Sequence, residues 1–238
     1  MATGQQIGSA TPSVGHADGA YEQIKAAIIT GALAPGSKVS EPELAKRLGV
    51  SRTPVHQAVV RLQDEEWLEV SSRRGLTIAP LEAGAMREIY EVLIGLEGIA
   101  VASLAGRSPE DPIDAELAAA NAKCEQALEQ HDLMMWAEAD NAFHRLLIES
   151  SGNSRLIRVG AMLEEHAHRA RLLTVRFRPV PTQSNIDHAN IASFIGKRDP
   201  VNARSELENH RKRGIDTLVP ILEALNPVPT ASFVRLGK

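Results

Sequence analysis

The chain contains 238 residues, of which 43% are hydrophobic and only 3% aromatic, and its formal net charge is −4. This length suits two compact domains with aliphatic helical cores, and the acidic balance excludes a general attraction to nucleic acid, so any DNA binding must be local. The sequence contains no run of about 18 apolar residues, so no membrane span is predicted. Cys124 is the only cysteine, which excludes an intramolecular disulfide and favours a reducing, cytoplasmic location.

The N-terminal residues predict a loose tail followed by a first helix. Residues 1–19 are small and polar and lack the charged start and apolar stretch of a secretory signal, so we expect a disordered tail. A helix is predicted over 21–34, with Ile24 and Ile28 on its apolar face. This helix opens a domain that we expect to span residues 20–80.

Two short helices with clear start signals come next. Ser40 begins a capping box whose hydroxyl can accept from the backbone N–H of Glu43, and Gly49 suits the end of this helix. Ser51 starts the second helix as its N-cap, with Pro54 in the first turn. This spacing is typical of a helix-turn-helix.

The second helix has one apolar face and one face that can donate to phosphates or base edges. Its candidate DNA-contacting residues are Arg52, Thr53, His56, Gln57 and Arg61. Residues 67–70 and 76–78 alternate as two short strands, and the turn between them carries Arg73 and Arg74. The order of these elements predicts a winged helix-turn-helix that reads DNA. The alternative is an αα-hairpin and a β-hairpin packed only for stability.

From residue 84 to residue 224 the pattern is helical throughout and contains no convincing strand. We therefore predict a mostly α protein, in which a winged helix-turn-helix is followed by an all-α helical bundle. The tail at 226–238 holds two prolines and is expected to be loose. The predicted helices of the bundle run from about Met86 to Leu104 and over 112–130, 132–150, 154–177, 182–197 and 200–224.

One carboxylate and three histidines of the bundle form a candidate metal site. Asp140 and His144 are four residues apart and share a helix face, while His188 and His210 lie on two later helices. Neutral imidazoles and a carboxylate suit zinc, nickel, manganese or iron. Taken singly, each histidine is more often a satisfied or surface residue. His166 and His168 are rivals for the same site.

The chain resembles GntR-family transcriptional regulators of the FadR type. Residues 20–80 match the family pattern of a helix, Pro-Gly, LAxxLGVSRTPVxxAVxRL and a wing, and residues 84–222 resemble the family's helical effector domain, FCD. The FCD motif is an aspartate and a histidine four residues apart, then an acidic-His pair, then a histidine about 22 residues later. The residues Asp140, His144, Asp187, His188 and His210 match it.

The resemblance implies roles for several residues. Ser51, Arg52, Thr53 and His56 would face DNA, and Arg73, Arg74 and Gly75 would belong to the wing. This chain departs from the family at His56-Gln57, where Arg-Glu is usual, and at Leu93, where many relatives place an arginine that binds a carboxylate effector. Arg169 and Arg171 are the residues expected to take over that contact.

Together these features predict a dimeric, ligand-responsive regulator that binds a short palindromic operator. The helical domain, 84–224, would dimerise and bind a small organic or sugar acid at a divalent metal, with repression of a catabolic operon as the expected output. A metal-sensing regulator is the first alternative. A metalloenzyme is disfavoured because no general base or nucleophile lies at motif spacing and because an attached DNA-binding module would be unexplained.

Overall fold

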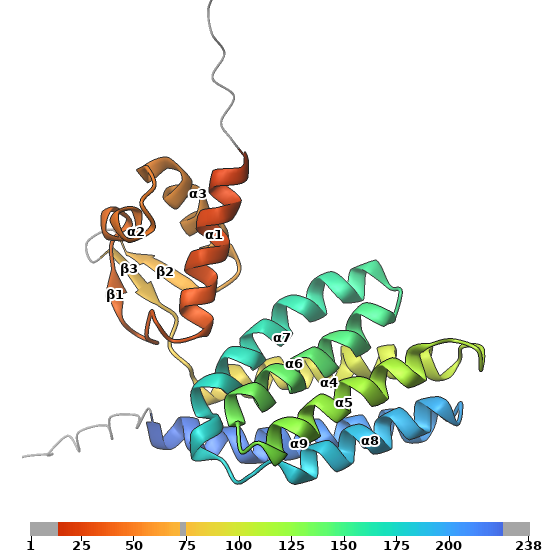
Figure 1. The fold of residues 1–238 in the computed structure, drawn as a ribbon. Coiled ribbons are helices and arrows are strands. Elements are labelled where there is room, and N and C mark those ends of the chain that lie inside the picture. Colours follow the sequence, from red (N-terminus) through yellow and green to blue (C-terminus); the bar gives the residue numbers. More distant parts are fainter. Residues whose placement is uncertain (1–13, 72–74, 226–238) are drawn as a thin grey trace, which may run out of the picture. The chain divides into compact units, whose positions relative to one another are not determined.

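The computed structural model describes residues 14–71 and 75–225, and it is mostly helical, as predicted (Figure 1). Apart from residues 29–31, the chain divides into two compact units between Ala79 and Pro80. The expected boundary, between 80 and 84, lies close to this division. The wing tip with Arg73 and Arg74 and the tail at 226–238 fall outside the described residues.

The first unit combines three helices with a small sheet. The strands are ordered β1-β3-β2, and both neighbouring pairs are antiparallel. The first strand was not predicted, because two residues are too few to show an alternating pattern. The elements are α1 (Val14–Ile29), β1 (Lys38–Val39), α2 (Glu41–Leu48), α3 (Arg52–Asp64), β2 (Leu68–Ser71) and β3 (Gly75–Ile78).

Helix α1 differs from its predicted bounds at both ends. It begins at Val14, so the expectation of a disordered tail is wrong for residues 14–19, which are helical. It ends at Ile29 rather than 34, because Gly31 adopts a left-handed conformation with φ of 80° that a continuing helix cannot contain. Small polar residues are weak helix formers in isolation, which is why the sequence pattern missed the first turns.

The helix-turn-helix forms as its local signals predict, with one exception. The Ser40 hydroxyl accepts a hydrogen bond of 3.3 Å from the backbone N–H of Glu43, and Gly49 ends α2 with a φ of 66°. Ser51 occupies the N-cap position of α3, but its side chain makes no capping hydrogen bond. Val55 and Leu62 are among the buried residues that fix α3 on the core of this unit.

Glu65 connects α1, α3 and the start of β2. Its carboxylate accepts hydrogen bonds from the Tyr21 hydroxyl at 2.5 Å, Lys25 Nζ at 3.2 Å, Arg61 Nε at 3.1 Å and Trp67 Nε1 at 3.2 Å. Burial alone would raise the pKa of the Glu65 carboxyl, but these donors outweigh it, so the pKa is lowered. The ionised carboxylate therefore stabilises the fold of this unit.

The second unit is an all-α bundle whose helices run side by side (Figure 1). Helix α4 packs along α9, and α6 packs between α5 and α7. The bounds match the predicted helices closely, except that a 3-10 turn forms the end of the predicted 154–177 helix. The elements are α4 (Ala83–Ala105), α5 (Ile113–Glu129), α6 (Leu133–Ser150), α7 (Ser154–Thr174), η1 (Val175–Phe177), α8 (Thr182–Gly196) and α9 (Pro200–Leu225).

Side-chain caps explain several of these helix starts. Asp132 accepts hydrogen bonds from the backbone N–H groups of Met134 and Met135 at the start of α6, and Asn153 caps α7 in the same way. Within the described ranges, each helix is too short or too polar to cross a bilayer.

We predict that Glu65→Gln destabilises the first unit by about 1–3 kcal/mol, because a partly buried acceptor of several donors loses its charge. The full difference should be present above the unfolded-state pKa of about 4.3. It should shrink as the pH falls through the lower pKa of the folded state, where the wild-type carboxylate becomes protonated too. Urea unfolding followed by tryptophan fluorescence between pH 3 and pH 7 measures this difference.

Glu69→Gln, at an exposed position of β2, is the matched control and should change the unfolding free energy little. A Glu65→Gln protein with wild-type stability at neutral pH would contradict the role given to this carboxylate.

Candidate metal centre and DNA-binding surface

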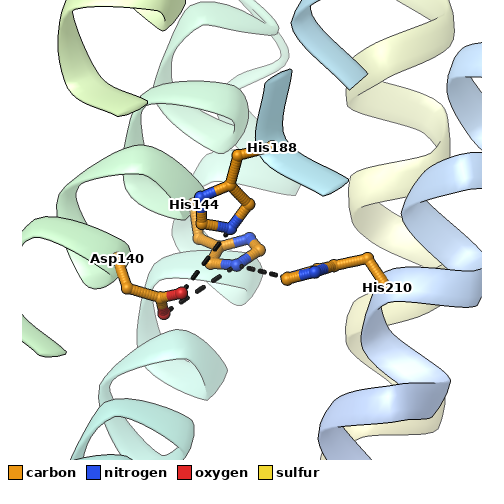
Figure 2. Close-up of side chains that lie close together, drawn as sticks. All are labelled: Asp140, His144, His188 and His210. Carbon is orange, nitrogen blue, oxygen red and sulfur yellow. Dashed lines mark hydrogen bonds and ion pairs between the residues drawn. The ribbon is translucent and has the colours of Figure 1, made fainter. Parts of the chain in front are cut away.

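Four side chains from three helices converge in the interior of the second unit (Figure 2). Asp140 and His144 come from α6, His188 from α8 and His210 from α9. All four are buried, and one potential ligand atom of each lies within 4.8 Å of the others. His188 Nε2 is 3.5 Å from Asp140 Oδ1, and His144 Nε2 is 4.0 Å from Asp140 Oδ2. The structure thus brings together the four residues that the sequence pattern proposed.

Two carboxylates behind the histidines orient their rings. His144 Nδ1 lies 2.9 Å from Glu97 Oε1, and His210 Nδ1 lies 3.2 Å from Asp187 Oδ2. Each Nδ1–H is therefore assigned as a donor to a carboxylate, which leaves the Nε2 lone pair for the cluster. The two Nε2 atoms are 3.1 Å apart. Two lone pairs at this distance repel each other, and a cation between them would remove the repulsion.

The protonation states also suit a metal. Burial lowers the pKa of His144 well below its usual value and lowers that of His188 to about 3, so both rings are neutral at pH 7. Burial would raise the pKa of the Asp140 carboxyl, but the Arg171 guanidinium and the neighbouring imidazoles outweigh it and the pKa is lowered. Neutral nitrogens and an ionised oxygen are the ligands that divalent zinc takes.

The separations of the four residues fit a metal of this size. Ligands about 2.0–2.1 Å from a tetrahedral zinc lie roughly 3.4 Å from one another. Three of the separations are 3.1, 3.5 and 4.0 Å, and all four ligand atoms lie within 4.8 Å of one another. Neither ring nitrogen of the buried His188 has a hydrogen-bond partner among the described residues, a costly arrangement that a metal ligand would explain.

The two rival histidines do not belong to the cluster. His168 Nε2 lies 3.3 Å from Glu138 Oε2, and His166 is another buried residue of α7 outside the four-residue group. The fold therefore groups the histidines of α8 and α9 with Asp140 and His144 and leaves those of α7 outside the cluster.

A chain of buried ion pairs surrounds the cluster. Arg171 Nε contacts Asp140 Oδ2 at 2.8 Å, and its Nη2 contacts Glu164 Oε1 at 3.1 Å. Arg211 joins Glu164 at 2.6 Å to Glu97 at 2.6 and 2.7 Å. Glu97, Glu164 and Arg211 were not predicted from the sequence. Their signal was a charged residue inside an otherwise apolar helix face, which indicates a buried partner but not which one.

The two arginines expected to bind an effector occupy different environments. Both are buried, and Arg171 contacts the cluster through Asp140. Arg169 precedes it by two residues, which is about 200° around a regular helix, so Arg169 lies on the other side of α7. Of the pair, only Arg171 is positioned next to the candidate metal ligands.

A pocket of about 350 Å³ adjoins the cluster. His210 lines it directly, and Asp187, which orients His210, is part of its wall. Ser184, another lining residue, donates its hydroxyl to Asp140 Oδ1 at 3.4 Å. The volume suits a small metabolite, and such a molecule would lie beside the candidate metal.

In the first unit, the predicted DNA-contacting residues of α3 are exposed. Ser51, Arg52, Thr53, His56 and Gln57 all lie on the surface, opposite the buried face of the helix. Of the wing residues, Gly75 starts β3 with a φ of 75°, and an added Cβ there would lie 3.1 Å from the Val39 carbonyl.

Two of the α3 residues have partners within the unit. His56 Nδ1 lies 3.0 Å from Glu41 Oε1. Arg61 contacts Glu65, and its guanidinium carbon lies 3.6 Å from the centre of the Tyr21 ring. Arg61 is thus part of the packing of α3 on α1, which makes it a weaker candidate for a DNA contact than Arg52.

Comparisons with known proteins agree with this architecture. The structure superposes on E. coli McbR/YncC with a TM-score of 0.74 over 89% of this chain and 99% of that one, at 22% identity. An Agrobacterium vitis protein described as an uncharacterized HTH-type transcriptional regulator is 40% identical over 59% of this chain and 84% of its own length. A probable D-xylose utilization operon transcriptional repressor of Paenarthrobacter nicotinovorans is 27% identical over 77% of this chain and 80% of its own length.

Two sequence families account for both units. Residues 16–78 match the family described as bacterial regulatory proteins, gntR family, and residues 88–213 match the FCD domain. These assignments confirm the resemblance noted in the sequence and identify a regulator rather than an enzyme. The chain belongs to the GntR family of bacterial transcriptional regulators, with an FCD domain as its helical unit.

Proposed function

We propose that this regulator is a homodimeric repressor of a catabolic operon. A small organic or sugar acid that binds beside a divalent metal would weaken or strengthen its binding to the operator. The regulator would act on short palindromic operators in the cytoplasm. The observation that carries this proposal is the buried cluster of one aspartate and three histidines next to a pocket, in a chain that also contains a helix-turn-helix. An operon repressor among the relatives supports the direction of the response.

The exposed face of α3 supports major-groove binding. Arg52 stands at its N-terminal end, is exposed, and makes no ion pair with the described residues, so its guanidinium is available for a base or phosphate. With Nδ1–H donated to Glu41, the tautomer of His56 that fits this contact would present Nε2 to a ligand as an acceptor. Thr53 and Gln57 lie on the same exposed side, and the wing would add contacts from its own residues.

We predict that Arg52→Ala weakens operator binding by about 1–3 kcal/mol, or roughly 5- to 150-fold, if the guanidinium reads a base. Gel shifts or fluorescence anisotropy at fixed salt measure the change. Arg155→Ala, at an exposed position of α7, is the control with the same loss of charge and should bind as wild type. Unchanged operator affinity of the Arg52 variant would remove this residue from the DNA surface.

An exposed apolar stripe on α4 supports dimerisation through the helical unit. Val92 is 49% exposed and Ile99, two turns later, is 52% exposed. Gly95 lies between them, and an added Cβ there would meet nothing within 4 Å. Large apolar side chains at this spacing, with an open glycine between them, suit close packing against a second copy of the helix.

We predict that Ile99→Glu converts the dimer into a monomer and lowers operator affinity at least roughly tenfold, because each subunit would then bind only a half-site. Light scattering coupled to size exclusion gives the mass. Val201→Glu, at a 75% exposed position of α9, places the same charge on another helix and should stay dimeric. A dimeric Ile99→Glu protein would exclude this stripe as the interface.

Asp140, His144, His188 and His210 would hold the metal, with zinc first and nickel, manganese or iron as the other candidates. A bound divalent ion would act as a Lewis acid that attracts an oxygen of the effector. The carboxylates of Glu97 and Asp187 would keep two of the imidazoles in the required tautomer.

We predict that His188→Ala loses most of its bound metal, since it removes one of four ligands. Elemental analysis of the desalted protein measures the metal content. His131→Ala replaces an exposed histidine outside the cluster and should retain wild-type content. Full occupancy in the His188 variant would show that the metal is bound elsewhere.

A metal-sensing regulator is the second candidate, because the four protein ligands alone can complete a tetrahedral site. Dialysis against a chelator separates the two functions. Loss of operator binding with no organic compound present would favour metal sensing. Operator binding that survives metal removal, and responds to an acid only when the metal is restored, would favour the metabolite sensor.

A further inference from the structure

Four arginines lie around the metal cluster and its pocket, and three of them are already paired with carboxylates of this chain. Arg171 and Arg211 form the buried ion pairs with Asp140, Glu164 and Glu97. Arg213 contacts both oxygens of Asp187, at 2.7 and 2.9 Å. The charge of each of these three guanidinium groups is therefore neutralised within the fold.

Arg178, the fourth, has no such partner. It follows the short helix η1 and lines the pocket. Its Nε and Nη2 atoms donate to the Thr174 hydroxyl at 3.1 and 2.9 Å, and its other polar neighbour is the Tyr90 side chain. Within the described part of the chain, no carboxylate forms an ion pair with it. A half-buried guanidinium whose hydrogen bonds go to hydroxyls lacks the paired carboxylate that the other three arginines have.

The electrostatic contrast with the paired arginines supports this difference. Burial lowers the pKa of the Arg178 guanidinium, and its surroundings do not reverse the effect. Burial acts in the same direction on Arg171 and Arg211, but their carboxylate partners outweigh it and raise the pKa of both. The protein thus provides negative charge to Arg171 and Arg211, whereas the environment of Arg178 is electrostatically incomplete.

The position of Arg178 is fixed by the backbone around it. Pro179 follows directly and Pro181 lies three residues after Arg178, and a proline restricts both its own φ and the conformation of the residue before it. The hydrogen bonds to Thr174 hold the guanidinium on this backbone, so it needs little ordering when a ligand arrives, which favours binding. Tyr90 supports it from α4, and the ring of Tyr90 is itself packed near Arg211, 5.4 Å from ring centre to guanidinium carbon.

The wall of the pocket is partly apolar. Trp136 lies in it with its indole N–H already donating to Asn185 at 2.9 Å, so the ring presents an apolar face. Val180 adds a second apolar side chain beside the prolines. His210 belongs to the same wall as these groups, which places the candidate metal and Arg178 on one cavity.

We propose that Arg178 binds the anionic group of the effector, in the pocket that His210 shares with the metal cluster. The ligand is a small organic anion, and Arg178 selects it over neutral compounds of the same shape. This assignment rests on the proposed function, because it requires an effector at this site. It replaces Arg169 and Arg171, the residues indicated by the sequence, as the anion contact.

The test uses full-length, zinc-loaded protein and two acids, benzoate and citrate, with benzamide as the uncharged match for benzoate. Thermal unfolding and calorimetric titration measure binding. The variants are Arg178→Gln and, as a control with the same loss of charge, Arg176→Gln, which changes an exposed residue of η1. Arg178→Lys is added to separate charge from shape.

At least one acid should raise the unfolding midpoint of the wild type and of Arg176→Gln, while benzamide should not. Arg178→Gln should bind that acid about 10- to 100-fold more weakly, the usual effect of losing a charge-assisted hydrogen bond, and Arg178→Lys should fall between. Without acid, Arg178→Gln should unfold at a temperature no lower than wild type, because an uncompensated cation has been removed.

Three results would overturn the proposal. The first is no acid-dependent shift of the unfolding midpoint in the wild type, and the second is an equal shift in Arg178→Gln. The third is a marked drop in the unfolding midpoint of that variant without acid, which would make Arg178 a structural residue. Metal content and operator binding of the wild type are measured in the same preparation. Their absence would refute the proposed function itself, whereas their presence beside any of the three results would refute only the anion site.

Discussion

The burial of several charges inside one helical bundle is the constraint on which the rest of the second unit depends. Isolating a carboxylate or guanidinium from water costs several kcal/mol, and the cost is recovered only if partners are placed with good geometry. Arg171 and Arg211 meet this requirement by bridging Asp140, Glu164 and Glu97. The network joins α4, α6, α7 and α9, so a shift of any one of these helices along its axis would separate a buried pair.

The same network explains why a metal would stabilise the folded bundle. With its carboxyl groups ionised, the network of Asp140, Glu164, Glu97, Arg171 and Arg211 contains one more negative than positive charge. A divalent cation would reverse the sign of this excess and leave a positive interior. An anion at Arg178 would then be favoured by the cation as well as by the guanidinium, so metal and effector binding would be coupled.

Much of this could be predicted from the sequence, and the limits have physical reasons. The helices of the bundle follow from apolar spacing and from cap residues such as Asp132, because those signals are local. Asp140 and His144 could be paired since they lie one turn apart, but His188 and His210 needed the family motif or the fold. Glu97 could not be assigned, because its partner is 114 residues away in the chain.

The proposed anion contact, Arg178, also could not be chosen from the sequence alone. Arg169, Arg171 and Arg178 look alike in sequence, since each is a cation near the end of one long helix. They differ in what the fold places around them, and a guanidinium already neutralised by its own chain has little to gain from an incoming anion. The property that distinguishes Arg178 is therefore the lack of a paired carboxylate, and only the folded bundle shows which arginine lacks one.

The proposed DNA-binding surface differs from the candidate metal site, because its specificity depends on a contact between residues that are close in the sequence. Glu41 lies fifteen residues before His56 and orients its ring, so in the proposed DNA complex a neutral His56 would offer Nε2 to the major groove as an acceptor. An acceptor pairs with the amino group of cytosine or adenine, whereas an arginine at the same position would donate to guanine. The preferred operator should therefore differ at this base pair from that of relatives with the usual arginine, and only a protonated His56 could donate to guanine in its place.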